Sequence, residues 1–197
     1  MSRRFFKGSA LAAPLPAMLV TSRYEGRDNV MTAAWTGIVN TRPPMAYVSV
    51  RPERASYRMI KESGVFVLNL TTSKMARETD FCGMKSGAKV GKIKKCRFTL
   101  TPAENVDCGI IEQSPASMEC RISREIDLGS HVMFIADIVG VSVDERFIDS
   151  KGKFNFGQAG LLAYSHGEYF SLGRKLGDFG FSVRKNRRVA GPVRYVK

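Results

Sequence analysis

The chain has 197 residues, of which 44% are hydrophobic and 25% are charged. This length and composition are typical of one globular domain with a core of its own, and they exclude a disordered, collagen-like or disulfide-stapled chain. The net charge is +13, and the segment from Arg174 to Lys197 carries eight basic residues and one acid, Asp178. Because so much of the excess positive charge lies near the C-terminus, the charge of the remaining chain favours a phosphate-bearing small molecule over nucleic acid as a partner.

The first twenty residues give no sign of a membrane segment or a signal peptide. The stretch from Ser9 to Val20 is the most apolar one, and Pro14 and Pro16 interrupt it. The basic start of the chain is not followed by a clean apolar run of the kind that secretion signals contain. We therefore expect a cytoplasmic protein that does not enter a membrane.

Period-2 patterns predict strands in most of the chain, at residues 16–22, 30–40, 45–51, 65–70, 119–126 and 131–143. Turn residues separate them at 24–29 and 128–130. Short helices are predicted at 55–62, ending at Gly64, and at 72–81, followed by a loop over 82–91. Residues 154–181 are rich in glycine and aromatics, and we expect an arm packed on the main body or on a second subunit. Many short strands without long crossover helices favour a small antiparallel barrel over a parallel doubly wound sheet.

The segment from Asn29 to Gly37 is the first candidate binding site. Its small residues Thr32, Ala33 and Ala34 would let a flat ligand approach the backbone, whose N–H groups could bond an electron-rich ring edge. The same stretch also fits a strand packed against a neighbour, and Trp35 fits a core or interface residue as well as a stacking platform.

The segment from Ser49 to Arg58 is the second candidate site, because a strand ends there and a helix begins. Hydroxyl groups, guanidinium groups and free helix N–H donors would converge on a few residues, which suits one phosphate group. A capped helix with solvated arginines fits the same residues.

Other residues give weaker indications. The loop Phe81–Gly87, followed by Lys89 and Lys92, could hold an anion, although it lacks the order of a Walker A motif. His131 begins an apolar strand and could be catalytic or structural. The four cysteines contain no CxxC pair, so we expect reduced thiols and no metal site.

Six of these segments, taken in order, resemble the flavoredoxin branch of the flavin reductase-like FMN-binding proteins. They are Asn29–Gly37, Ser49–Tyr57, Phe66–Leu70, Phe81–Gly87, Gly129–Phe134 and Ala163–Tyr169. The resemblance implies a mainly β fold: a six-stranded antiparallel split β-barrel of Greek-key type with a few short helices. It also implies a homodimer with FMN at the subunit interface.

The same resemblance implies the roles of individual residues. The FMN phosphate would be held by Arg51, Ser56 and Tyr57, with help from Ser86 and Lys92. Thr32, Ala33, Ala34 and Trp35 would border the isoalloxazine ring, and Asn29 and Met31 from the same segment are also expected to bind the cofactor. Ser49 and Val50 would lie along the ribityl chain, and Cys82 to Gly87 would close over the cofactor. His131, the expected catalytic residue, would face a bound nicotinamide.

The resemblance implies an FMN-dependent oxidoreductase that passes electrons from NAD(P)H through FMN to a flavin, ferric or protein acceptor. The alternatives are a flavoredoxin-type electron-transfer protein with no nicotinamide turnover, and a barrel that only holds its ligand. We expect the barrel domain to span residues 1–185. Residues 186–197, which extend beyond the family pattern, are expected to form a basic tail.

Overall fold

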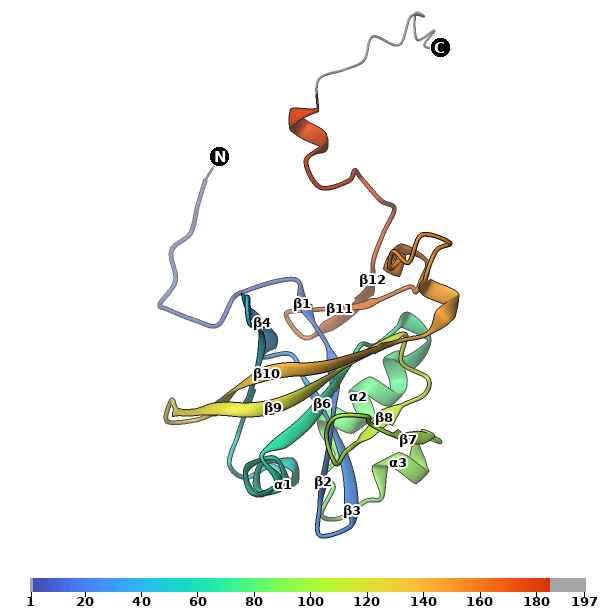
Figure 1. Cartoon of the computed structure of the whole chain (residues 1–197). Coiled ribbons are helices and arrows are strands. Elements are labelled where there is room, and N and C mark those ends of the chain that lie inside the picture. The colour runs from blue at the N-terminus through green and yellow to red at the C-terminus, as the bar shows by residue number, and fades with distance from the viewer. Residues whose placement is uncertain (1, 185–197) are drawn as a thin grey trace, which may run out of the picture.

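Antiparallel strands dominate the fold (Figure 1). A computed structural model describes residues 2–184, so the predicted basic tail at 186–197 lies outside the described residues. The strands are β1 (Leu15–Pro16), β2 (Met18–Tyr24), β3 (Arg27–Ala33), β4 (Thr36–Thr41), β5 (Pro44–Val50), β6 (Val65–Asn69), β7 (Leu100–Pro102), β8 (Gly109–Ile111), β9 (Ala116–Asp127), β10 (Val132–Val143), β11 (Leu162–Ser165) and β12 (Glu168–Ser171). The helices are α1 (Ala55–Ser63), α2 (Ala76–Met84) and α3 (Lys92–Lys95), with 3₁₀ turns at Ser73–Met75, Glu145–Phe147, Phe156–Gln158 and Phe181–Val183.

The main sheet has seven strands in the order β3-β2-β6-β9-β10-β5-β4, all antiparallel neighbours. The predicted mainly β, split-barrel class is thus confirmed, with one strand more than expected. Inward residues alternate as predicted on β5, where Ala46, Val48 and Val50 are buried, and on β6, where Phe66 and Leu68 are buried. These side chains belong to one apolar core cluster that the sheet encloses.

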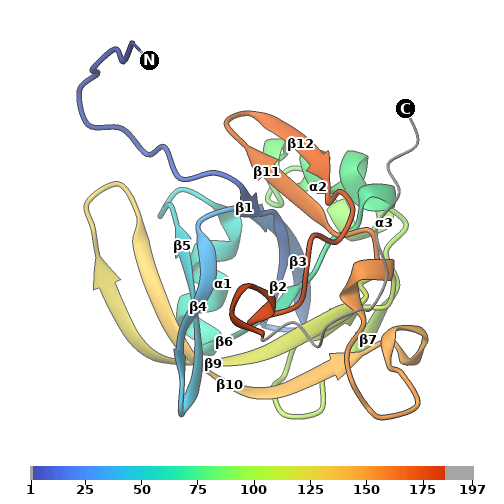
Figure 2. The same cartoon turned by 90° about the horizontal axis from the view of Figure 1, so that it is seen from above.

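The strand predicted at 30–40 is two strands, and this is a correction. The chain bends at Ala34 and Trp35, so that β3 and β4 lie at opposite edges of the same sheet. The backbone N–H of Ser49 donates to the carbonyl oxygen of Trp35 at 2.8 Å, which ties the bend to the end of β5. The sheet curls to bring its edges together at this bend, as the view from above shows (Figure 2).

The helices lie outside the barrel and differ in part from the prediction. α1 ends as expected at Gly64, whose left-handed backbone (φ 70°) allows its N–H to reach the carbonyl of Ile60. The second helix begins and ends later than predicted, at Ala76 and Met84, so the loop predicted at 82–91 begins only after that helix. Cys82 and Gly83 therefore occupy the last turn of a helix.

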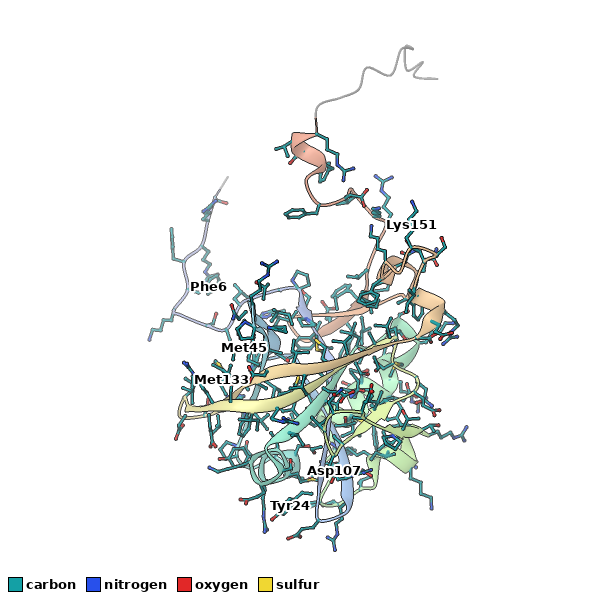
Figure 3. All side chains as sticks on the ribbon, viewed as in Figure 1. Phe6, Tyr24, Met45, Asp107, Met133 and Lys151 are labelled. Atoms are coloured by element: carbon teal, nitrogen blue, oxygen red, sulfur yellow. The ribbon has the colours of Figure 1, made fainter. Side chains whose placement is uncertain are left out.

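The two ends of the described chain lie outside the seven-stranded sheet. β11 and β12 form a hairpin that pairs with β1, with Leu15 opposite Tyr164. The predicted arm is thus partly a sheet. Residues 172–184 and the N-terminal residues 2–14 extend from the same side of the barrel (Figure 1). Phe6 stands clear of the other elements (Figure 3), and its side chain is 81% exposed.

Candidate functional site

Two adjoining pockets open between the bend at Ala34–Trp35, the start of α1 and the end of α2. The larger has a volume of about 370 Å³, and we call it the slot. The smaller, about 220 Å³, is called the anion pocket. Both are lined by Met31, Arg51, Arg54 and Met84, so the two form one continuous site.

The slot is lined by small residues because β3 ends beside α2. The small side chains of Ala33 and Ala34 leave space in the slot. The Thr32 hydroxyl turns toward α2 and donates to the carbonyl oxygen of Thr79. A Cβ on Gly83 would lie 3.4 Å from the Thr32 Cβ, so the small side chains also let α2 pack closely. Trp35 is partly exposed at the edge of the slot. This shape suits a flat ring system.

The anion pocket lies against the N-terminus of α1. Arg54 is the residue before this nine-residue helix. Its side chain makes no capping hydrogen bond to the helix, and the first turn of the helix holds no acid. Ala55 and Ser56 line the pocket at that end. The unpaired N–H groups and positive end of the helix therefore favour an anion there.

Four cationic side chains line the anion pocket with one acidic side chain, Glu53. The cations are Arg51, Arg54, Lys85 and Lys92. Arg51 Nη1 lies 3.5 Å from the Glu53 carboxylate, and Arg54 Nη1 donates to the carbonyl oxygen of Gly83 at 2.8 Å. The excess of positive charge would be compensated by an anion with more than one negative charge.

Lys92 is the buried cation of this pocket, with only 4% of its surface exposed. Its Nζ donates to the carbonyl oxygen of Cys82 at 3.0 Å, and no carboxylate pairs with it among the described residues. Burial lowers the pKa of Lys92, because desolvation disfavours the ammonium form. A buried ammonium without a carboxylate partner destabilises the fold unless an anion joins it, which indicates a binding role.

Asn29 and Ser56 fix the back of the anion pocket. The Asn29 amide donates to the Ser56 hydroxyl at 2.8 Å, and both residues are buried. Gly87 covers this pair so closely that a Cβ on it would lie 2.1 Å from the Asn29 Oδ1. A larger residue there would force the Asn29 side chain to shift, so glycine lets the loop after α2 close over Asn29.

Most residues predicted for the site line these pockets. The slot contains Met31, Thr32, Ala33, Ala34, Trp35, Ser49, Arg51 and His131. The anion pocket contains Asn29, Ser56, Ser86 and Lys92. Segments far apart in the sequence therefore meet in one place.

The structure does not bring Val50, Tyr57 or Cys82 into the site. Val50 is buried in the barrel core, and Cys82 lies on the buried side of α2 in a second apolar cluster. The Tyr57 ring packs on Phe134, and its hydroxyl donates to the Glu125 carboxylate at 3.5 Å. A direct role for these three side chains in binding is not supported by their positions.

Sequence reasoning missed several lining residues. Asp80 lies within the predicted helix but was given no role in the site. Met84 belongs to the segment expected to close over the cofactor and was not singled out there, and the structure places it at the end of α2. Tyr164 and Tyr169 come from β11 and β12, and only the pairing of β11 with β1 brings them to the slot. Their rings lie 5.5 Å apart, and burial together with Asp80 raises the pKa of Tyr169 to about 12. The aromatic character of residues 154–181 was the available signal.

His131 lines the slot directly before β10. Its Nδ1 lies 3.0 Å from the Ser130 hydroxyl, which orients the ring. The side chain is half-buried, so one nitrogen is held while the other can face a molecule in the slot.

Two further observations concern the residues that the structure describes. Within residues 2–184, none of the helices combines the length and apolar character required to cross a bilayer. In the same part of the chain, no three His, Cys, Asp or Glu residues lie close enough together to hold a metal ion.

Comparisons with known proteins agree with this geometry. Residues 11–173 match the family described as flavin reductase like domain. An uncharacterized protein of Archaeoglobus fulgidus is 32% identical over 143 residues, which cover 73% of this chain and 80% of that protein. The flavoredoxin of Desulfovibrio vulgaris (Miyazaki F) superposes with a TM-score of 0.86 at 28% identity, over 93% of this chain and all of that one.

A second similar structure is an FMN-binding protein from Thermus thermophilus with bound 1-cyclohex-2-enone. It has a TM-score of 0.75 at 22% identity and covers 90% of this chain and 97% of that one. At that identity the likeness concerns the fold alone.

Proposed function

This chain belongs to the flavin reductase-like domain family, and we propose that it passes electrons from NAD(P)H through bound FMN to a flavin, ferric or protein acceptor. The observation that carries the proposal is the anion pocket beside a flat slot, with Lys92 buried in the pocket and paired with no carboxylate of residues 2–184. A ligand with a charged end and a flat end fits this pair of pockets.

FMN is the cofactor, and the residues present fit it. Its phosphate is a dianion at neutral pH, which matches the basic side chains and the free N–H groups at the start of α1. Its ring is flat and apolar, which matches the wall formed by Ala33 and Ala34. When bound, FMN supplies the hydride and electron chemistry, so the protein itself needs no acid–base triad.

The chain's own residues would bind and orient the cofactor. Lys92, Arg51 and the N–H groups of Ala55 and Ser56 would hold the phosphate, while the Asn29–Ser56 pair keeps the pocket in shape. Arg54 lines both pockets where they join, and Ser49 lines the slot. Backbone N–H groups near Ala34 would bond the ring edge and stabilise negative charge there.

We assign the open side of the slot to the electron donor. His131, Tyr164 and Tyr169 line it together with Asp80. His131, held by Ser130, is the side chain we expect to orient a nicotinamide ring. Because the sequence contains no G-x-G-x-x-G motif of the kind that binds dinucleotides, the nicotinamide would bind only for the transfer.

A homodimer is part of the proposal, and exposed apolar side chains support it. Ile38 and Val39 on β4 are 57% and 47% exposed, and Ile126 and Leu128 at the β9–β10 hairpin are 39% and 54% exposed. These strands lie on one side of the main sheet, next to Trp35 at the edge of the slot. A second copy placed there would cover apolar surface and enclose the slot.

The second candidate function is a flavoredoxin-type electron carrier that takes electrons from a protein. The likeness to a flavoredoxin at 28% identity over 93% of the chain favours this candidate specifically. A cytoplasmic location, which we expect from the sequence, stays a prediction, as do the domain limits at 1–185 and 186–197.

Anaerobic mixing with NADH or NADPH tests the proposal. The FMN-loaded protein should lose its absorption near 450 nm (roughly the oxidised-flavin band) within seconds of mixing. If neither nucleotide bleaches the flavin and a reduced ferredoxin-like protein does, the nicotinamide-dependent function is wrong and the carrier function is supported. Size-exclusion chromatography with light scattering on the same sample tests the dimer.

A further inference from the structure

Two of the four cysteines lie in contact beside the anion pocket. The Sγ atoms of Cys82 and Cys96 are 3.7 Å apart, and both thiols are free. Cys82 is on the buried side of α2, and Cys96 follows the last residue of α3. A disulfide needs its sulfurs at about 2.0 Å, so the two thiols already lie close to bonding distance.

Both cysteines are hydrogen-bonded to Lys92, Cys82 through the lysine side chain and Cys96 through the lysine backbone. The Lys92 side chain donates to the carbonyl oxygen of Cys82, and its backbone carbonyl accepts from the N–H of Cys96 at 2.8 Å. A bond between the two sulfurs would therefore join α2 and α3 around the residue that lines the anion pocket.

A third cavity gives access to this pair. It has a volume of about 580 Å³, and Cys96 is one of its lining residues, whereas Cys82 is fully buried. Its lining residues include two acids, Glu78 and Asp80, and more bases, namely Arg77, Lys85, Lys95 and Arg97. We call it the basic cavity. Its charge favours an anionic reagent over a neutral one.

We propose that Cys82 and Cys96 form a reversible disulfide, and that the oxidant is an anionic low-molecular-weight disulfide that enters the basic cavity and reacts first with Cys96. This reaction is independent of the redox chemistry of the flavin site. It would lock α3, which carries Lys92, against α2.

The chemistry balances in two exchange steps. The Cys96 thiolate attacks one sulfur of the small disulfide, whose S–S bond breaks and releases one thiolate. Cys82 then loses its proton and attacks the Cys96 sulfur, the mixed S–S bond breaks, and the second thiolate leaves. Overall, the two cysteines lose two electrons and two protons, and the small disulfide becomes two thiols.

The order of attack follows from exposure. Burial raises the pKa of Cys82 to about 12, and it raises that of the half-buried Cys96 as well. Cys96 is the thiol that the reagent can touch, so it reacts first. Cys82 can react only with a sulfur already beside it.

Peptide mapping of the flavin-free full-length chain tests the proposal. The reduced protein is incubated with glutathione disulfide, which is anionic, and digested with trypsin without reductant. Trypsin cuts at Lys85 and Lys95, so the two cysteines fall on different peptides. We expect one linked pair containing Cys82 and Cys96, which dithiothreitol releases. A stable glutathione adduct alone, or no reaction, would overturn the proposal.

Two variants separate the steps. Cys82→Ser should accumulate the glutathione adduct on Cys96, and Cys96→Ser should form neither adduct nor link. The buried Cys108 provides the matched control, since Cys108→Ala should still form the link. Should either single variant fail to fold, the wild-type peptide map alone still decides between link and no link.

The rate of the reaction with glutathione disulfide tests the role of the charge in the basic cavity. The variants to compare are Lys95→Gln and Lys94→Gln. Lys95 lines the basic cavity, and Lys94, one residue away, does not. We expect Lys95→Gln to slow the reaction by about threefold or more at low salt, and Lys94→Gln to leave it unchanged. Equal rates for both variants, with no dependence on salt, would overturn the assignment of an anionic oxidant.

Discussion

The Nζ of Lys92 donates a hydrogen bond to the carbonyl oxygen of Cys82 at 3.0 Å, and this contact holds a buried ammonium group at the anion pocket. The last turn of α2 thereby fixes the position of a charge carried by α3. No described carboxylate compensates it. The fold thus retains a destabilising charge where a phosphate would bind.

Replacing Lys92 separates binding from stability. Lys92→Met should weaken FMN binding by about 10- to 100-fold, or roughly 1.5–3 kcal/mol, because a charge-assisted bond to the phosphate is lost. The thermal midpoint of the flavin-free protein should not fall, since a buried charge is removed. Fluorescence titration and calorimetry measure the two effects. Lys94→Met, on the exposed side of the same helix, is the control; equal FMN affinity in both variants would contradict the role of Lys92.

The pH dependence should have opposite signs for binding and stability. Burial lowers the pKa of Lys92. As the pH rises, Lys92 therefore loses its positive charge earlier than an ordinary lysine does. FMN affinity should therefore decrease through that window. Stability of the flavin-free protein should increase there, because the unfolded chain binds the extra proton. Lys92→Arg keeps its charge throughout, so its FMN affinity should stay level; a parallel decrease in this variant would point to another group.

Replacing Gly87 is predicted to weaken FMN binding. Gly87→Ala would push a methyl group into the Asn29 side chain and separate it from Ser56, because the ideal Cβ position lies 2.1 Å from Oδ1. We expect FMN affinity to decrease by about tenfold or more. Gly91→Ala is the matched control, since nothing lies within 4 Å of a Cβ there. Similar losses for both variants would show that loop flexibility matters rather than this contact.

His131 is predicted to affect electron transfer from nicotinamide more than cofactor binding. His131→Ala should slow anaerobic flavin reduction by about tenfold, with FMN affinity changed by much less, because the ring lines the slot and not the anion pocket. Stopped-flow absorbance gives the rate. His166→Asn, in the exposed β11–β12 turn, serves as control because asparagine tolerates its left-handed backbone. An unchanged rate in His131→Ala would make this histidine structural.

Local patterns predicted much of the fold and part of the site. Alternation identified the buried face of β5 at Ala46 and Val48, and Gly64 marked the end of α1 correctly. The bend at Ala34–Trp35 was missed, because apolar residues continue through it and only tertiary closure of the sheet shows the break.

Long-range packing explains the other differences. Tyr57 lies next to Ser56 in the segment predicted to bind a phosphate, yet the helical turn directs its ring to Phe134. Tyr164 reaches the slot only because β11 pairs with β1, about 150 residues away in sequence. The close fit of Gly87 over Asn29 likewise depends on two segments that sequence spacing does not relate.

The most direct measurement compares the affinity of the flavin-free protein for FMN and for riboflavin, which lacks the phosphate. If the phosphate is anchored by Arg51, Lys92 and the start of α1, FMN should bind at least about 100-fold more tightly. Arg51→Ala should reduce that ratio by about tenfold, whereas Arg58→Ala, exposed further along α1, should leave it unchanged. Equal affinities for FMN and riboflavin in the wild-type protein would contradict the phosphate site.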